Sequence, residues 1–297
     1  MEKILYGAMY SFKEIKSSKI FYSFLIFALI LISGSYFVSQ TSFINQGRIM
    51  VDFSIFAISI FNIFIGIFIG SSVVYDDIEK KSVFLALTRP IRRTQYLIGR
   101  FLGLAAAIIF STIIMMLIFY FVLLIMHKFI VPAMPVVKTV RHAIKPPLAG
   151  SMPFTLYSLP QPLIIQGFFI IIESVFISAA ALLFSLVTSK ALASIFAILV
   201  FFIGNVSSRM NDLIKPVRKV INGKTVTVHQ ANHTLAAIVH FIYTVLPNFS
   251  LFNISSEAAY KISVSGGGIS YRIIYGICYT ALLFVISSLI FASKDIA

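Results

Sequence analysis

The stretch FLGLAAAIIFSTIIMMLIFYFVLLIM, residues 101–126, contains no lysine, arginine, aspartate or glutamate. A helix rises about 1.5 Å per residue, so a helix of this length crosses the roughly 30 Å hydrocarbon core of a bilayer. Charged side chains are rare in that core because each costs about 3 kcal/mol on insertion. An uncharged stretch of this length therefore predicts a transmembrane helix and places the chain in the membrane class.

Five further stretches have the same character. Four of them are also uncharged, and the remaining one, residues 163–187, carries a single acid near its middle, Glu173. We therefore predict an all-α integral membrane protein, built as a single domain over residues 1–297 with six transmembrane helices. The spans are expected at about residues 20–41, 54–74, 101–126, 163–187, 191–208 and 273–293.

The composition agrees with this class, because 59% of the residues are hydrophobic and 11% are charged. The net charge of +14 does not indicate a nucleic acid partner, since cytoplasmic loops of membrane proteins collect lysine and arginine. With the N-terminus inside, twelve of the 24 basic residues fall on each side. The inner ones crowd into about 50 residues and the outer ones spread over about 115, and short loops obey the rule best. We predict a multi-pass protein of the cell membrane, plasma or inner, with a cytoplasmic N-terminus.

Two long loops are expected on the outer side, at residues 127–162 and 209–272. The first is rich in proline, which disfavours helix. In the second, Asn222-Gly223 suits a hairpin turn. Residues 235–252 are uncharged but contain Pro247, whose missing N–H interrupts a helix. We predict that this last segment is re-entrant or interfacial and does not cross the bilayer.

Residues 1–19 have the pattern of an amphipathic helix that lies in the membrane interface. A simple positively charged flank for the first span is the alternative interpretation. At helical spacing, one face carries Leu5, Ala8, Met9, Phe12 and Ile15, and the opposite face carries Lys3, Lys13, Glu14 and Ser17.

No residue pattern predicts catalysis or a cofactor. The GKT at residues 223–225 imitates the end of a phosphate-binding loop, but Arg218 stands where that loop requires glycine. Cys278 is the single cysteine, so a cysteine cluster is excluded. His229 and His233 share a helical metal-ligand spacing but have no nearby pair of acids. We expect no metal site, no bound cofactor and no enzymatic activity in this chain.

Glu173 is the one acid deep within a predicted span. Ionisable groups at this depth usually face a bundle interior or an aqueous cavity, because contact with lipid is costly. One interpretation is a place on a translocation path, as a substrate contact or a protonation switch. The other is a protonated carboxyl that joins two helices by a hydrogen bond.

The most informative segment is DDIEKKSVFLALTRPIRRTQYLIGRFLG, residues 76–103, on the predicted cytoplasmic side. Its apolar run, residues 83–87, is too short to span. Pro90 suits the first turn of a new helix, with Thr88 as its cap. The pattern predicts a short helix across the membrane face that docks into a groove of a soluble partner. An ordinary positively charged cytoplasmic loop is the alternative.

This segment resembles the cytoplasmic loop of ABC-2-type transporter permeases, particularly the multicopper-enzyme-maturation branch. Those permeases show an acidic residue, Lys-Thr or Lys-Ser, a hydrophobic run, Arg-Pro, Arg, an aromatic residue and Gly-Lys. A Leu-Pro-Asn at residues 246–248 and a charged ending at residues 294–295 are similar as well. In the loop, the corresponding residues are Asp77, Glu79, Lys81, Ser82, Phe84, Leu87, Arg89, Pro90, Arg93, Tyr96, Gly99 and Arg100.

Two departures from the family pattern bear on the subfamily. Arg100 replaces the usual lysine and keeps the charge. Lys81-Ser82 stands where many relatives have Gly-Thr, which leaves the subfamily and the transported substrate open.

The resemblance implies a permease subunit that forms the translocation path. A separate ABC ATPase subunit would bind ATP and Mg and would dock on the coupling loop, residues 76–100, through the twelve residues named above. Its closure would tilt the spans of two permease subunits, in a homodimer or a heterodimer, within the lipid bilayer. Two alternatives stay open from the residues alone: a secondary transporter or channel that works through Glu173, and a membrane scaffold without transport.

Overall fold

The computed structural model describes residues 2–41, 46–79, 93–125, 161–214, 217–221, 224–228, 247–254 and 266–293. Apart from one small strand pair, the regular elements in these residues are helical, which confirms the all-α class. In chain order they are α1 (Glu2–Lys16), α2 (Lys19–Ser39), α3 (Gln46–Val73), α4 (Tyr75–Glu79), α6 (Arg93–Ile125), α8 (Gln161–Val187), α9 (Lys190–Ile214), β1 (Val217–Ile221), β2 (Lys224–Val228), η3 (Phe249–Phe252) and α12 (Gly266–Ser293).

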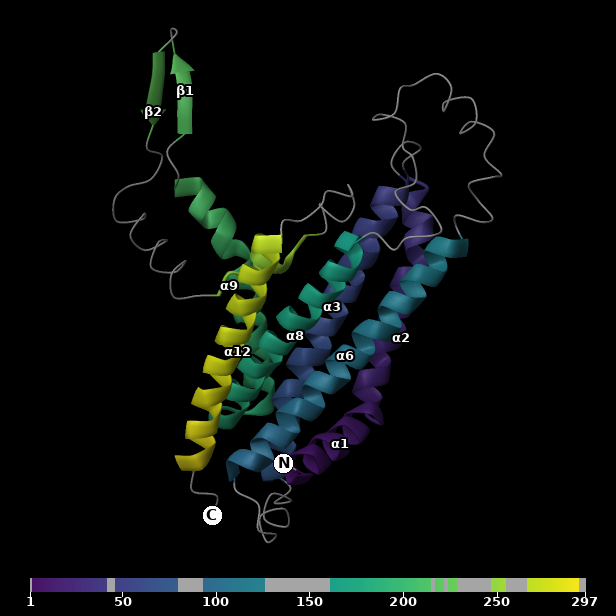
Figure 1. Cartoon of the computed structure of the whole chain (residues 1–297), viewed down its shortest axis with the longest axis vertical. Helices are drawn as coiled ribbons and strands as arrows, with labels where there is room; N and C mark the ends of the chain where they lie inside the picture. Colours follow the sequence, from purple (N-terminus) through teal and green to yellow (C-terminus); the bar gives the residue numbers. More distant parts are fainter. Residues whose placement is uncertain are drawn as a thin grey trace.

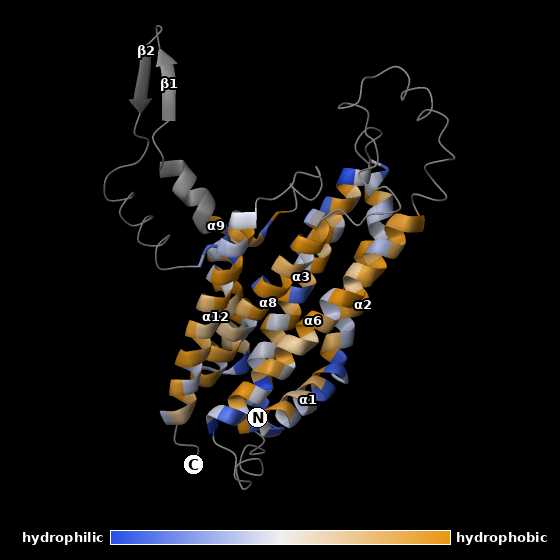
Figure 2. Ribbon diagram, in the orientation of Figure 1, coloured by the Kyte–Doolittle hydropathy of each residue, from blue (hydrophilic) through white to orange (hydrophobic). Residues whose placement is uncertain are grey.

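Five of the described helices are long and apolar enough to cross a membrane. They cover residues Lys19–Ser39, Gly47–Glu79, Arg93–Ile125, Pro162–Val187 and Gly266–Ser293. The predicted span at residues 191–208 corresponds to α9, whose apolar part, Lys190–Val206, is shorter. Figure 2 shows apolar residues along the bundle and hydrophilic ones gathered near its ends, including α1. This distribution is the one that a bilayer requires.

Several helices begin earlier than the predicted spans. The sequence windows ended at charged residues, whereas a helix continues beyond the hydrocarbon wherever its backbone hydrogen bonds continue. The predicted coupling loop at residues 76–100 is correspondingly shorter, because both of its ends are helical. The helices concerned are α3, which begins at Gln46 rather than residue 54, α6, at Arg93 rather than 101, and α12, at Gly266 rather than 273.

Helices α3 and α8 form the centre of the bundle, with α2 and α6 on one side and α9 and α12 on the other (Figure 1). Small residues allow α3 and α8 to approach closely. A Cβ atom at Gly66 would lie 2.9 Å from the carbonyl oxygen of Ser174, and one at Gly70 would lie 3.0 Å from that of Ser178. Close packing of this kind holds helices together in lipid, where the hydrophobic effect between helices is absent.

We expect Gly66→Val to lower the free energy of unfolding by about 1–3 kcal/mol, because the added methyl groups force the two central helices apart. The measurement is a thermal melt of the purified protein in mild detergent. Gly34→Val is the matched control, since a Cβ at Gly34 in α2 meets nothing within 4 Å. Equal melting temperatures for the two variants would contradict the assigned packing.

The segment around η3 is packed inside the bundle. Phe249 and Phe252 are each 1% exposed, and the Phe249 ring centroid lies 4.9 Å from that of Phe176 in α8. The side-chain oxygen of Gln166 accepts a 2.8 Å hydrogen bond from the backbone N–H of Ile254. Residues 247–254 therefore enter the bundle without forming a spanning helix, as the re-entrant interpretation predicts for this part. Residues 235–246 lie outside the described residues.

The two ends of the chain's helical part lie at the same end of the bundle (Figure 1). At that end α1 packs on the start of α6 through Gly7 and Gly99, and Phe291, near the end of α12, stacks on Tyr96 of α6. A chain that crosses a membrane an even number of times has its first and last helices ending on the same side of the membrane. The arrangement therefore agrees with six membrane-crossing helices, of which α9 is one.

The outer loops are described only in part. Residues 127–160 lie outside the described residues. In the second loop, β1 and β2 pair antiparallel with Ile221 opposite Lys224, which confirms a hairpin at the predicted position.

Candidate functional site

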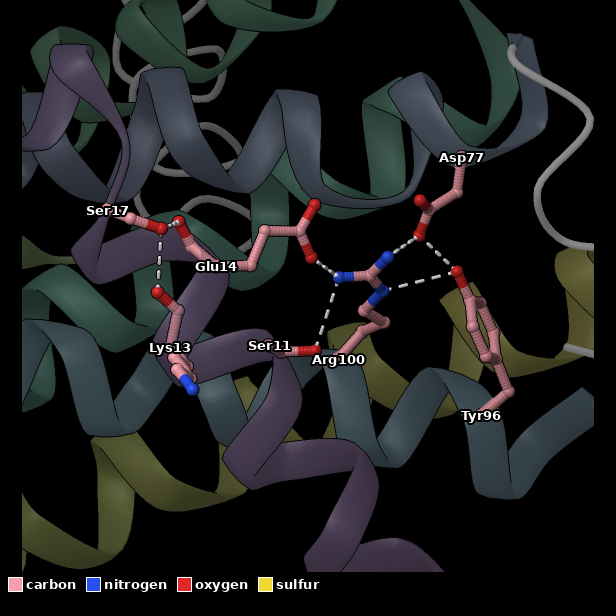
Figure 3. Close-up of polar contacts among 7 residues, drawn as sticks. All are labelled: Ser11, Lys13, Glu14, Ser17, Asp77, Tyr96 and Arg100. Atoms are coloured by element: carbon pink, nitrogen blue, oxygen red, sulfur yellow. Dashed lines mark hydrogen bonds and ion pairs between the residues drawn. The ribbon is translucent and has the colours of Figure 1, made fainter.

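A buried arginine joins three helices at the end of the bundle where α1 lies. Arg100 is 7% exposed and forms ion pairs with Asp77 of α4 and Glu14 of α1. Its Nε donates a 3.2 Å hydrogen bond to the hydroxyl oxygen of Tyr96, and that hydroxyl donates to Asp77. Figure 3 shows the guanidinium between the two carboxylates, with Ser11 beside it. We call Ser11, Glu14, Asp77, Tyr96 and Arg100 the polar junction.

The guanidinium of Arg100 also makes a polar contact with a hydroxyl group and contacts with two aromatic rings. Its Nη1 lies 3.4 Å from the hydroxyl oxygen of Ser11. Its central carbon lies 5.6 Å from the ring centroid of Tyr10 and 5.7 Å from that of Tyr96. Arginine suits this place because its planar, permanently charged group binds two carboxylates in fixed directions and also stacks on rings. A lysine has a single point charge and would lose this geometry.

Glycines bring α1 into reach of Arg100. A Cβ atom at Gly99 would lie 3.3 Å from the Cα of Gly7. One at Gly103 would lie 2.7 Å from the carbonyl oxygen of Ala8 and 2.9 Å from the backbone nitrogen of Phe12. The two backbones therefore touch at this point, so that Ser11 and Glu14 are held against α6.

A second ion pair connects α4 to α9, on the other side of the bundle. Nζ of Lys190, the first residue of α9, lies 3.0 Å and 3.2 Å from the two carboxylate oxygens of Asp76. Nearby, the hydroxyl groups of Ser71 in α3 and Ser194 in α9 are 2.9 Å apart. Asp76 and Asp77 are neighbours on α4, so this helix connects α9 to α6 and α1.

An apolar cluster lies against the polar junction. Val74, Leu97, Leu186 and Phe291 are buried together there, and the Tyr96 ring is stacked 6.1 Å from that of Phe291. The charges of Arg100 and Asp77 are therefore shielded from water, and their attraction is stronger than it would be on an open surface. The arrangement acts as a rigid clamp between α1, α4 and α6.

The structure brings together part of the predicted coupling residues. Asp77, Tyr96 and Arg100 meet in the polar junction, and Gly99 provides the close contact with α1. Glu79 is exposed at the end of α4. Arg93 donates a 3.3 Å hydrogen bond from its Nη1 to the backbone oxygen of Ala292. The remaining predicted residues lie outside the described residues; they are Lys81, Ser82, Phe84, Leu87, Arg89 and Pro90.

Sequence reasoning did not find the partners of these residues. Ser11, Glu14 and Lys190 were assigned no contact with the coupling loop. The predicted apolar face of α1 divides in the structure: Leu5 and Met9 point outward, whereas Ile15 is buried together with Ser11. The available signal was the small residues Gly7, Ala8 and Ser11, whose spacing marks a close helix contact.

Glu173 lies in α8 and is 6% exposed. Two apolar grooves, of about 470 and 350 Å³, run between α6 and α8, the first also bordered by α12. Glu173 does not line either groove. Within the described residues, no group of three or more histidine, cysteine, aspartate or glutamate side chains is placed to hold a metal.

The chain was also compared with known proteins. A family model described as "ABC-2 family transporter protein" matches residues 3–296. The match includes α1, α4 and α6, the helices that build the polar junction. No curated protein matches the chain. The family agrees with that expected from the segment at residues 76–103, and the multicopper-enzyme-maturation branch stays a prediction.

Proposed function

This chain belongs to the ABC-2 family of transporter proteins, and from that premise we propose that it is the permease subunit of an ATP-binding cassette transporter. In this role it forms the translocation path and takes its driving force from a separate ATPase subunit. ATP and Mg are bound by that partner. Two permease subunits, identical or different, make up the membrane part of the complex in the cell membrane, with the N-terminus in the cytoplasm.

The observation that supports this role is the polar junction. Residues 80–92, the central part of the proposed coupling loop, connect α4 to α6, and both of these helices are anchored at that point. Asp77 and Arg100 pair across the two flanks of the loop. A load applied to the loop therefore acts on both flanks together.

The anchoring also distributes such a load through the bundle. Arg100 binds Glu14 of α1, and Asp76 binds Lys190 of α9. Close-packed helices respond to a local load by moving as rigid bodies, because packed interfaces have few intermediate arrangements. Nucleotide-driven closure of the ATPase would in this way bias the bundle between two packings.

We expect Arg93→Glu to weaken the association with the ATPase by about tenfold or more. In the proposed contact the positive Arg93 meets an acidic or phosphate-rich surface of the ATPase, and a glutamate there would be repelled by that surface. The measurement is co-purification of the tagged chain with its ATPase from the native host in mild detergent. Arg48→Glu is the matched control, since Arg48 is a half-exposed arginine near the other end of the bundle, in the first turn of α3.

Other outcomes of the purification contradict the proposal. If Arg93→Glu and Arg48→Glu both leave the ATPase bound at the wild-type level, the coupling contact lies elsewhere. If the chain purifies as an oligomer without an ATPase and supports flux in vesicles, a secondary transporter that works through Glu173 replaces the permease. If an ATPase binds and no transport follows, the chain is a membrane scaffold.

A further inference from the structure

Helix α1 presents a second, largely exposed face to its surroundings. Leu5, Tyr6, Met9 and Tyr10 are 71%, 72%, 66% and 66% exposed, respectively. They lie on the sides of α1 away from the buried Ser11, and the ring of Tyr10 also borders the guanidinium of Arg100. Four large apolar or aromatic side chains on two turns of one helix form a patch that soluble proteins rarely leave in water. A patch of this kind marks a surface that contacts another protein or a membrane.

The charges beside this patch are positive. Lys13, Lys16 and Lys19 are all exposed at the end of α1 and the start of α2. The Nζ of Lys16 lies 5.0 Å from the ring centroid of Phe110. Of the two acids on α1, Glu14 is engaged by Arg100, which leaves Glu2 at the opposite end of the helix. The apolar patch and the lysines beside it are therefore complementary to an apolar layer that is bordered by negative charges.

The position of α1 favours a bilayer surface over a protein groove. Its last residue lies close in sequence to Lys19, where the first spanning helix begins. Tyrosine is enriched at the level of lipid headgroups, and lysine side chains reach from apolar surroundings to phosphate groups. A helix with an apolar face and basic flanks binds anionic membranes in this way.

We propose that the outer face of α1 binds anionic phospholipid, with Leu5 and Met9 in the upper acyl region and Lys13, Lys16 and Lys19 against the headgroup phosphates. The same helix carries Ser11 and Glu14, which contact Arg100. Lipid binding therefore seats α1 on the polar junction, so that the charge of the leaflet sets how firmly α1 is clamped. This consequence for coupling rests on the proposed function, whereas the binding itself does not.

The chain contains no tryptophan, so Met9→Trp introduces a single fluorescent probe on the patch. The full-length variant is reconstituted into vesicles that contain either phosphatidylcholine or phosphatidylglycerol, at the same mole fraction, brominated near the top of the acyl chain. We expect fluorescence quenching about twofold stronger with brominated phosphatidylglycerol, because the lysines enrich anionic lipid around α1. Added salt should reduce this preference, as it screens the headgroup attraction.

Two further variants make the result specific. Changing Lys13, Lys16 and Lys19 to glutamine in the Met9→Trp background should make quenching by the two brominated lipids equal. Leu117→Trp places the probe on α6 at a side chain that is 62% exposed, and it should be quenched equally by both lipids in every background. Circular dichroism of each variant verifies that the helices are retained.

Either of two outcomes would overturn the proposal. Equal quenching of the Met9→Trp probe by both lipids would mean that the face has no preference for anionic headgroups. Quenching by aqueous iodide and by neither lipid would mean that the patch faces water and serves a protein partner. No ATPase is present in these vesicles, so a failure here is distinct from a failure of the permease proposal.

Discussion

Arg100→Met is expected to lower the free energy of unfolding by about 3–5 kcal/mol, because removing one member of a buried ion pair leaves the other charge buried without compensation. The charge left behind is that of Asp77, whose side chain is 11% exposed. The hydroxyl of Tyr96 also loses one of its partners. The measurement is the melting temperature and the yield of monodisperse protein by size-exclusion chromatography in mild detergent.

Glu14→Gln is the matched control for this result. It removes a charge from the same junction, but the Glu14 side chain is 50% exposed and its carboxylate is partly solvated. The expected cost is therefore about 1 kcal/mol or less. If Arg100→Met melts at the same temperature as Glu14→Gln, the guanidinium does not hold the junction together.

The double variant Arg100→Met/Asp77→Leu separates folding from coupling. Replacing a buried ion pair by apolar side chains of similar size is often neutral in stability, so we expect about 2 kcal/mol or more to be regained over Arg100→Met alone. The recovered protein has an apolar contact in place of the directed ion pair. Under the permease proposal, it binds the ATPase but transmits its closure poorly, which appears as ATP hydrolysis without transport.

Gly103→Leu is expected to destabilise the protein by about 3 kcal/mol, at the upper end of the range for overpacking. Backbone atoms of Ala8 and Phe12 border the position of the new side chain, at 2.7 Å and 2.9 Å from a Cβ atom. Backbone cannot move aside as a flexible side chain does, so α1 has to leave α6. The released helix should be cleaved by trypsin at Lys13 and Lys16 faster than in the wild-type protein.

Gly34→Leu controls for the introduction of a leucine into a helix of this bundle. A Cβ at Gly34 meets no atom within 4 Å, so the melting temperature and the trypsin pattern should stay close to those of the wild type. A Gly103→Leu protein with wild-type cleavage at Lys13 would show that α1 does not depend on this contact.

Much of the fold follows from local properties of the chain. An uncharged stretch such as residues 101–126 can be recognised without any partner, because the bilayer imposes one length and one polarity on every spanning helix. Pro247 likewise predicted an interruption of helix, since the missing N–H acts locally, and residues 247–254 do not form a spanning helix. Asn222-Gly223 predicted the hairpin of β1 and β2 for another local reason, because these two residue types readily adopt the positive φ angles of a two-residue hairpin turn.

Helix boundaries were less predictable. Charged residues marked the ends of the hydrocarbon, and α6 continues past them because helix formation depends on backbone hydrogen bonds and not on the membrane boundary. Arg93, Tyr96 and Arg100 were assigned to the coupling loop, residues 76–100, in which a new helix was expected from Pro90. In the structure they lie on successive turns of α6, which continues without interruption into the spanning helix.

The membrane class, the spanning helices and the family motif at residues 76–103 could be predicted from the chain, because each depends on residues that are close together in it. The pairing of Arg100 with Glu14 and Asp77, which are 86 and 23 positions away, became visible only in the folded protein. Pairing over such distances depends on which helix faces meet. For Glu14 the faces that meet are set by the close glycine contacts between α1 and α6, which depend on the shape of the two backbones and not on a local pattern of charge.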